Sequence, residues 1–418
     1  MTIQQDNKLI TPLRSFPRIV GTIAIVISCL VFVGWIYDRE LFKNGFPGLV
    51  TIKANTTLCL VVLALFITVL LAFSIPLVAV AQDKIRIKPD IGGFFEVWHV
   101  LDERSTPPNG STNTFRVRRA RLIISDSLSE LFYYRLQVVH EGSQTKLFDA
   151  FIDIRWKPWL QWRIGQFKYP FTLEGLENAL LLPFILRSES VNFLGSNPGS
   201  EGNNFRDIGI QMMGSLSYPV VLHYAFAVIN GNGINTVDNN NSKDVVGKLE
   251  WRFQKDISFG SSAFIGRVQT ASASQYTEKA YNLYFDYAPT FFQGVKIRSE
   301  FVKGRIMNVN VSLPQDISGQ NLNGISVLGS YKLQKPLPPI EAAIRWEQFV
   351  ANESNSSYKI RMSTVALTYY VDGLSRVRFN YLIRKAGTDV SGPTYVQEAQ
   401  GVGNEIKNLF LTQFLLIF

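Results

Sequence analysis

The chain has 418 residues, of which 46% are hydrophobic, 13% aromatic and only 18% charged. The many aromatic residues favour strands over a helical bundle, and the charged fraction is low for a soluble protein of this length. The formal net charge of +9 could suit nucleic acid, anionic lipid or anionic solutes. The basic residues are scattered rather than clustered with stacking aromatics, which argues against a nucleic-acid partner.

The sequence offers few residues for catalysis or metal binding. Its two cysteines, Cys29 and Cys59, lie near the N-terminus, and its three histidines lack metal-ligand spacing. Phosphate-binding glycine loops and hydrolase motifs are absent from the sequence. Asp149 and Asp153 share one face of a predicted strand, which is ordinary for a charged strand face. We therefore predict no enzyme activity, no cofactor and no metal.

Residues 1–56 and 57–81 form an apolar N-terminal region that is predicted to be helical. The first segment contains the apolar run Ile19–Ile36, and each segment is long enough to cross a bilayer as a helix, which takes about 20 residues. Residues 1–56 either reflect a start site assigned too far upstream or are the remnant of a gene fusion.

The second of these segments resembles a signal peptide. Lys53 precedes it, Pro76 interrupts its apolar core, and it ends in Ala79-Val80-Ala81. This Ala-x-Ala pattern predicts cleavage after Ala81 and export through the periplasm. The alternative is a membrane helix that stays attached.

From residue 82 to residue 418 the sequence changes to short segments that alternate apolar and polar residues. In Asp244–Phe253 the odd positions are apolar or glycine, and the even positions are mostly charged. In Phe148–Lys157 the same rule places Phe148 on the apolar face. A period of two is typical of strands with one apolar and one polar face.

We predict an all-β fold for residues 82–418, a transmembrane antiparallel β-barrel of about 16 strands. A soluble sandwich would also alternate, but here the apolar faces end in aromatic residues and short turns alternate with longer polar loops. A closed barrel also leaves no backbone group unpaired in lipid. The predicted strand centres are Phe94, Val117, Gln137, Ile152, Trp162, Ile210, Tyr224, Leu249, Phe264, Leu283, Ile297, Val327, Ile344, Val365, Phe379 and Phe414.

The chain ends in Phe418 on an alternating last strand. A terminal aromatic residue resembles the assembly signal of outer-membrane proteins, so Phe418 predicts the bacterial outer membrane as location and the barrel assembly machinery as partner. Leu415 and Ile417 depart from the pattern because they make the lumen-facing positions apolar. An ordinary last core strand is the alternative.

Two stretches resemble the phosphate-selective porin O/P family, and the similarity extends loosely from Lys84 to Phe418. They are Phe115–Leu122, which reads FRVRRARL, and Trp162–Glu174, which reads WRIGQFKYPFTLE. The resemblance implies a homotrimeric pore of about sixteen strands, set in outer-membrane lipid, with a long third loop folded inward.

Family members that select phosphate line the narrowest point of the pore with paired arginines and a nearby aspartate. Arg118 and Arg119 match the arginine positions, and Asp149 matches the aspartate position. Gly175 stands where those members place a lysine, and Phe94 stands where they carry an arginine. The resemblance therefore implies a general anion preference more than phosphate specificity.

Arginine side chains on the predicted strands could form an anion path, because arginine binds phosphate or carboxylate through two parallel hydrogen bonds. Adjacent residues point to opposite faces of a regular strand, so Arg118 and Arg119 both reach the lumen only at a β-bulge. The alternative is a solvated ladder of arginines paired with carboxylates. The candidates are Arg118, Arg119, Arg155 and Arg163.

Residues 169–205 form the longest link between predicted strands and contain the helix-like run Glu174–Leu186. The apolar part of this link is unsuited to water, and a loop of this length is uncommon unless it is functional. We predict that it folds into the barrel and narrows the pore, with Lys168 and Arg187 as flanking anion contacts. An external loop at a subunit contact is the alternative.

These observations predict a porin for the passive diffusion of small hydrophilic solutes, with a preference for small anions such as phosphate. One alternative is a periplasmic sensor or binding protein with a β-domain that is anchored in the inner membrane. Another is a barrel that is plugged by its own loop and conducts nothing.

Overall fold

The structure is a computed structural model, and it describes residues 89–102, 113–142, 144–195, 205–217, 220–253, 256–269, 275–305, 320–354, 359–372, 374–386 and 408–418. The predicted segments 1–56 and 57–81, with the cleavage site after Ala81, lie outside the described residues. In the part of the chain that is described, neither helix has the length and hydropathy needed to cross a bilayer.

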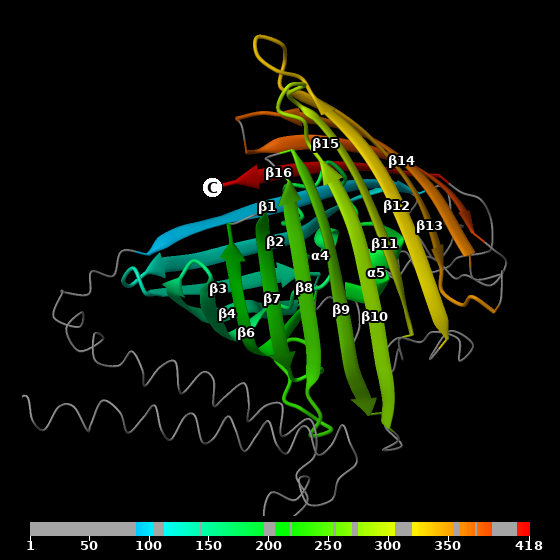
Figure 1. The fold of residues 1–418 in the computed structure, drawn as a ribbon. Helices are drawn as coiled ribbons and strands as arrows, with labels where there is room; N and C mark the ends of the chain where they lie inside the picture. Colours follow the sequence, from blue (N-terminus) through cyan, green and yellow to red (C-terminus); the bar gives the residue numbers. More distant parts are fainter. Residues whose placement is uncertain are drawn as a thin grey trace, which may run out of the picture. The chain divides into compact units, whose positions relative to one another are not determined.

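Sixteen antiparallel strands form one closed barrel, in which each strand pairs with its neighbours in sequence and β1 pairs with β16 (Figure 1). Each predicted strand centre lies within a strand, so the predicted barrel is confirmed. The strands are β1 (Asp90–Asp102), β2 (Asn113–Ser127), β3 (Phe132–Glu141), β4 (Gln144–Lys157), β5 (Leu160–Lys168), β6 (Arg206–Leu216), β7 (Val221–Ile229), β8 (Asp244–Phe253), β9 (Ile257–Gln269), β10 (Gln275–Tyr287), β11 (Val295–Arg305), β12 (Asn321–Lys332), β13 (Ile340–Val350), β14 (Lys359–Tyr370), β15 (Arg376–Ala386) and β16 (Asn408–Ile417).

The strand connections differ in length at the two ends of the barrel. At one end, the short-turn rim, neighbouring strands are joined by links such as 128–131 and 158–159. At the other end, the long-loop rim, the links include 169–205, 230–243 and 306–320. The predicted alternation of short turns and longer loops is therefore confirmed.

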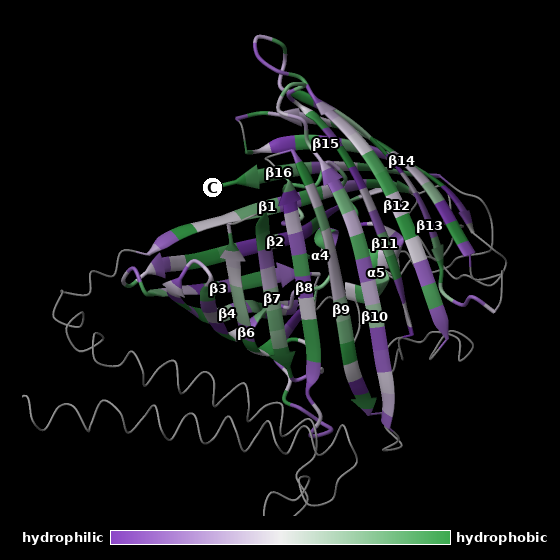
Figure 2. Cartoon of the chain, in the orientation of Figure 1, coloured by the Kyte–Doolittle hydropathy of each residue, from purple (hydrophilic) through white to green (hydrophobic). Residues whose placement is uncertain are grey.

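Alternating hydrophilic and hydrophobic bands run along the strands (Figure 2). On β13, the outward-facing Ile344 and Trp346 are 58% and 43% exposed, whereas Arg345 between them is 1% exposed. The outer surface is thus apolar, as a lipid environment requires, and the charged side chains surround the lumen.

A β-bulge in β2 brings two adjacent arginines to the lumen side. Glu96 pairs with Arg119, but the next residue of β1 pairs with Val117, so that Arg118 is the extra residue. Arg118 forms an ion pair with Glu141. The bulge that the sequence argument required is therefore present.

A second bulge, in β4, corrects the predicted position of Phe148. Gln137 pairs with Asp149 and its neighbour pairs with Leu147, which leaves Phe148 as the extra residue. Phe148 is 1% exposed and packs inside the barrel with Val139 and Ile234. The prediction that Phe148 lies on the outer apolar face is wrong, because simple alternation does not hold across a bulge.

Two short helices follow β5 on the way to β6, namely α4 (Leu173–Leu176) and α5 (Glu189–Gly195). The hydroxyl oxygen of Thr172 caps α4 by accepting a hydrogen bond of 3.0 Å from the amide of Gly175. Both helices lie within the ring of strands (Figure 1), where α5 contacts β12 and β13.

The helix-like run Glu174–Leu186 is for the most part not a helix. The chain leaves α4 after Leu176 and continues through turns and bends to residue 186. Pro183 has no backbone N–H group to donate the hydrogen bond that a continuous helix would need. Contacts to the barrel wall replace the missing helical hydrogen bonds, as described below.

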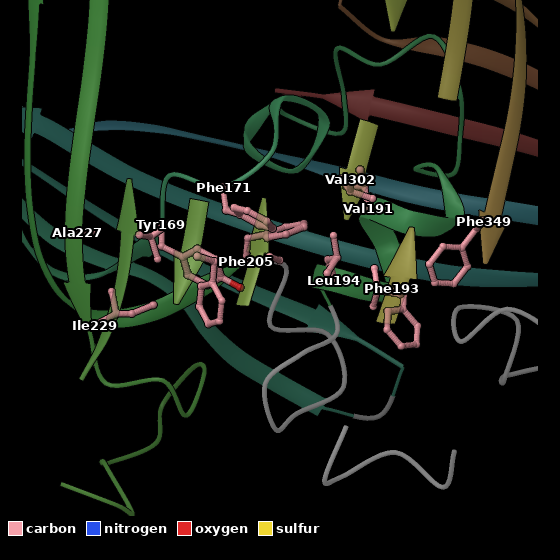
Figure 3. Close-up of a cluster of buried hydrophobic side chains, with 14 of the residues drawn as sticks. Tyr169, Phe171, Val191, Phe193, Leu194, Phe205, Ala227, Ile229, Val302 and Phe349 are labelled. Carbon is pink, nitrogen blue, oxygen red and sulfur yellow. The ribbon is translucent and has the colours of Figure 1, made fainter. Parts of the chain in front are cut away.

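An apolar cluster fills part of the lumen and joins this loop to the strands (Figure 3). The ring of Phe193 lies 5.2 Å from the ring of Phe349 in β13, and the ring of Tyr169 lies 5.9 Å from that of Phe205. Ile229 of β7 belongs to the same cluster. The loop is therefore packed on both sides of the barrel interior.

The last strand closes the barrel and explains its apolar inner face. The amide of Phe418 donates to the carbonyl of Gly93 at 3.1 Å, and the amide of Gly93 donates back at 2.9 Å. Leu415 packs with Leu180 of the loop and Phe94 of β1. The apolar lumen positions of β16 thus face the apolar part of the loop rather than water.

Candidate functional site

The loop between β5 and β6, residues 169–205, is called the inward loop below. Its first attachment is to β11, where the carboxylate of Glu300 accepts hydrogen bonds from the amides of Leu173 at 2.7 Å and Glu174 at 3.1 Å. These amides belong to the first turn of α4, where backbone N–H groups lack helical partners. A buried carboxylate of the wall therefore holds the start of the helix.

The second attachment is to β13 and centres on Arg345. Its guanidinium lies 3.2 Å from the carboxylate of Glu174 and donates to the carbonyls of Leu186 at 3.0 Å and Arg187 at 3.3 Å. Glu174 also accepts hydrogen bonds from the amide and hydroxyl of Ser188. Arg345 and Glu174 are both buried, so each charge is compensated within the protein.

The third attachment is to β15. The guanidinium of Arg378 donates to the carbonyls of Leu180 and Phe184, and the amide oxygen of Asn380 accepts from the amide of Ile185 at 2.8 Å. Glu177 of the loop pairs with Arg298 of β11. Side chains of the wall thus supply the hydrogen bonds that the backbone of the turn region would otherwise make within a helix or sheet.

Apolar side chains of the inward loop reinforce these polar attachments. Phe184 is fully buried and packs against Leu328, Ala343 and Ala366 on β12, β13 and β14. The neighbouring Ile185 and Leu186 pack with residues of β1, β14, β15 and β16. Strands β11 to β16 therefore form an anchoring wall for the loop.

On the other side of the loop, a cavity of about 700 Å³ lies against strands β2 to β8. Nine basic side chains line it, against three carboxylates. The basic residues are Arg119, Arg121, Arg135, Arg155, Arg163, Lys168, Arg187, Arg206 and Lys248, and the carboxylates are Asp149, Asp153 and Glu250.

Some of the lining arginines are neutralised by carboxylates. Arg206 lies 2.6 Å and Arg135 lies 3.5 Å from Asp149. Arg163 donates to both oxygens of Asp153, at 2.7 and 2.9 Å. These ion pairs account for two of the three acids in the cavity.

Arg121 differs from these residues because it has no carboxylate partner in the described structure. Its guanidinium lies over the rings of Phe94 and Phe148, at 5.1 and 4.8 Å from their centroids. Its Nε atom is buried without a hydrogen-bond partner among the described residues. The aromatic faces stabilise the cation, and the residue lines the cavity.

Lys168 and Arg187 are basic residues that line the cavity where it meets the inward loop. The ammonium of Lys168 donates to the carbonyl of Gly175 at 2.7 Å, and Arg187 donates to the carbonyl of Glu177 at 2.7 Å. Burial lowers the pKa of Arg187 to about 10. Arg187 is therefore still protonated at neutral pH, and the carbonyl oxygen of Glu177 does not cancel its charge.

The structure brings together most of the residues singled out from the sequence. Arg119, Asp149, Arg155, Arg163, Lys168 and Arg187 line the cavity. Arg118 does not, because the bulge turns it toward Glu141. Arg119 is in the cavity but is paired with Glu96 at 2.5 Å.

Sequence reasoning missed four basic lining residues, namely Arg121, Arg135, Arg206 and Lys248. Arg121 lies two positions after Arg119 and so shares its face of β2, which was a usable signal. Arg206 follows the long loop and gave no such signal. Among the described residues, no group of histidine, cysteine or carboxylate side chains could hold a metal ion.

Two family models match the chain. Residues 204–412 match the family described as putative beta-barrel porin-2, OmpL-like, and residues 100–300 match phosphate-selective porin O and P. A comparison with curated protein sequences gives no match.

Solved structures show the same fold at low sequence identity. An anion-selective porin from Comamonas acidovorans is 11% identical, with 79% of this chain and 99% of that chain covered and a TM-score of 0.59. OmpF of Salmonella typhi, in complex with daunomycin, is 12% identical, with 79% and 98% covered and a TM-score of 0.55. The outer-membrane channel DcaP of Acinetobacter baumannii is 10% identical, with 79% and 97% covered and a TM-score of 0.54.

These identities show the fold alone, whereas the family models also match the sequence. A closed barrel of sixteen strands with an apolar exterior and a charged interior agrees with both. The chain therefore belongs to the outer-membrane β-barrel porins, among which its residues 100–300 match the phosphate-selective porins O and P, and it is a channel for small solutes.

Proposed function

We propose that this porin is a passive diffusion pore that prefers small anions, phosphate among them. The observation that carries the proposal is the charge of the cavity beside the inward loop, where nine basic side chains meet three carboxylates. A wall of one charge sign in a narrow passage raises the local concentration of ions of the opposite sign.

The carboxylates of the inward loop do not offset this charge. Glu174 is bound to Arg345, Glu177 to Arg298 and Lys296, and Glu189 lies 4.0 Å from Arg384. All of these partners belong to the anchoring wall. The three described acids of the loop therefore pair with the anchoring wall and leave the excess of basic residues in the cavity uncompensated.

Arg121 is the residue best suited to contact a passing anion. A guanidinium can donate two parallel hydrogen bonds to a phosphate or carboxylate, and that of Arg121 contacts aromatic rings rather than a carboxylate among the described residues. Gly175 and Phe94 stand where phosphate-selective relatives carry basic residues, so the proposal is a preference for small anions in general.

The remaining parts of the proposal follow from membership of the family. We infer a homotrimer in outer-membrane lipid, export through the periplasm and assembly by the barrel assembly machinery with Phe418 as part of the signal. Catalysis has no place in this function, and the inner-membrane sensor would need no closed barrel with an apolar exterior.

The test is the reversal potential of the purified protein in planar bilayers under a potassium chloride gradient. We expect the potential to show anion preference, and we expect R121Q to move it measurably toward zero. The matched control is R361Q, which removes an outward-facing arginine outside the lumen. A reversal potential that favours cations in the wild type would refute the anion preference and leave the channel.

A plugged barrel is the second candidate, because the apolar cluster of Figure 3 occupies part of the lumen. It predicts a protein that assembles and shows heat-modifiable mobility on a gel but gives no conductance steps. The inner-membrane alternative would be favoured only by an intact Met1 in the inner-membrane fraction.

A further inference from the structure

Seven basic side chains lie on the outer surface of the barrel, close to the long-loop rim. The strand register places them outward, because each aligns with outward-facing neighbours rather than with the charged lumen positions. They are called the basic belt below. Its members are Arg267 on β9, Lys279 on β10, Lys303 and Arg305 on β11, Lys359 and Arg361 on β14, and Lys385 on β15.

The belt is a local feature of the barrel exterior. Near the long-loop rim, the outward-facing positions on the described parts of β1 to β8, β12, β13 and β16 carry no lysine or arginine. Basic residues that only kept the loops soluble would be expected on all strands around the rim. The belt instead occupies two groups of neighbouring strands, β9 to β11 and β14 to β15.

Two pairs within the belt place like charges directly opposite each other. Lys279 pairs in register with Arg305, and Arg361 pairs in register with Lys385. Like charges facing each other across neighbouring strands are destabilising. In the described structure none of these four side chains has a carboxylate partner, and Lys303 alone within the belt has one, Glu353 at 3.2 Å. An anion between the two cations of a pair would offset this repulsion.

The belt borders the apolar surface that faces lipid. Tyr281, two residues from Lys279, is 46% exposed, and Ile383, two residues from Lys385, is 47% exposed. Two residues along a strand span roughly 7 Å, or about 5 Å of height for a tilted strand. The charges thus lie at the level of lipid head groups rather than high in the water phase.

The rim on which the belt lies identifies the leaflet. In outer-membrane barrels the short turns are periplasmic and the longer loops are extracellular. The belt is near the rim that holds the links 270–274 and 306–320. It therefore faces the outer leaflet.

We propose that the basic belt binds the phosphates of anionic lipid head groups in the outer leaflet, and that these phosphates separate the like-charged pairs. Each pair offers two cations at cross-strand distance, which suits one phosphate group between them. Basic residues beside a bilayer are a general means of recognising anionic lipid. This function is separate from solute transport, because the belt lies outside the lumen.

The test measures the dissociation constant, Kd, of purified lipid A for the full chain, folded in neutral detergent, by native mass spectrometry. K279Q/R305Q and R361Q/K385Q each remove one like-charged pair, and we expect each to raise Kd roughly 10- to 30-fold. The matched control is K157Q/K335Q, which removes two exposed lysines at the short-turn rim. We expect the control to change Kd less than about twofold.

Inorganic phosphate, added at the concentration of lipid A, separates a lipid site from a site for free phosphate. The proposal is supported if inorganic phosphate does not displace lipid A from the protein. It is overturned if phosphate competes as well as lipid A itself. The proposal is also overturned if the control weakens binding as much as the belt variants, or if neither belt variant changes Kd. Reversal potentials of the belt variants should equal that of the wild type, so the outcome is independent of the transport proposal.

Discussion

Arg345 holds the inward loop against β13, and its replacement by methionine gives the sharpest test of how the loop is fixed. The guanidinium is 1% exposed and bonds the carboxylate of Glu174 and the carbonyls of Leu186 and Arg187. It also lies 3.1 Å from Glu347. R345M keeps much of the side-chain volume but leaves two buried carboxylates without this cation.

Removing one partner of a buried ion pair costs about 3–5 kcal/mol, because the other charge stays buried and uncompensated. The loop can escape this cost by leaving the lumen, so the change should appear as local opening rather than as unfolding of the barrel. Loss of 3 kcal/mol from the docked loop raises the ratio of open to docked loop roughly 150-fold, so we expect the open population to increase at least about 100-fold.

Trypsin provides the assay, because Arg187 is the sole lysine or arginine in residues 170–204. Cleavage at Arg187 requires the loop to open, and its rate follows the open population when opening is fast. The double variant E174Q/R345M should recover part of the protection, because it removes one of the stranded carboxylates. R361M is the control on the outer surface. A cleavage rate for R345M within about fivefold of the wild type would refute the reasoning.

Two further predictions concern the same loop. A Cβ atom at Gly324 would lie 2.4 Å from Cβ of Ser190 in α5. G324A should therefore destabilise the docked loop by roughly 1–3 kcal/mol and speed cleavage at Arg187. The control is G329A, whose Cβ meets nothing within 4 Å, and equal cleavage rates for the two variants would show that α5 does not need this space. Burial raises the pKa of Glu177, but Arg298 and Lys296 lower it further, so that its net pKa is below the usual value. This attachment is therefore lost only as the pH falls below about 4.5. The effect of E177Q on single-channel conductance should accordingly be the same at pH 7 and at pH 5, and an effect that disappears within that interval would contradict the assignment.

The barrel was predictable from the sequence because each strand has one face in lipid and one in the lumen. In β15, for example, Arg378 and Asn380 face inward while Phe379 between them faces outward. Period-2 alternation is a local property, so a single strand suffices to reveal it. The short turns and long loops then fix the order of the strands.

The details of the site were less predictable because they depend on contacts between distant residues. Nothing near Glu300 indicates that it binds the first turn of α4, and the bulge at Phe148 breaks the alternation without a glycine or proline to mark it. The apolar Leu415 looked anomalous on a lumen face until Leu180 was found packed against it. Such partners become visible only in three dimensions.

The attachments of the inward loop also bear on the order of folding. The amide of Ile185 meets Asn380 at a separation of 195 residues, and Glu174 meets Arg345 at 171. Contacts of such high sequence separation form late, since the intervening chain must first be ordered. Until the C-terminal strands are paired, the loop has no surface to dock on. A nascent or truncated barrel would consequently expose Phe184 and its neighbours to chaperones, and it would acquire a narrowed passage only in the final step of closure.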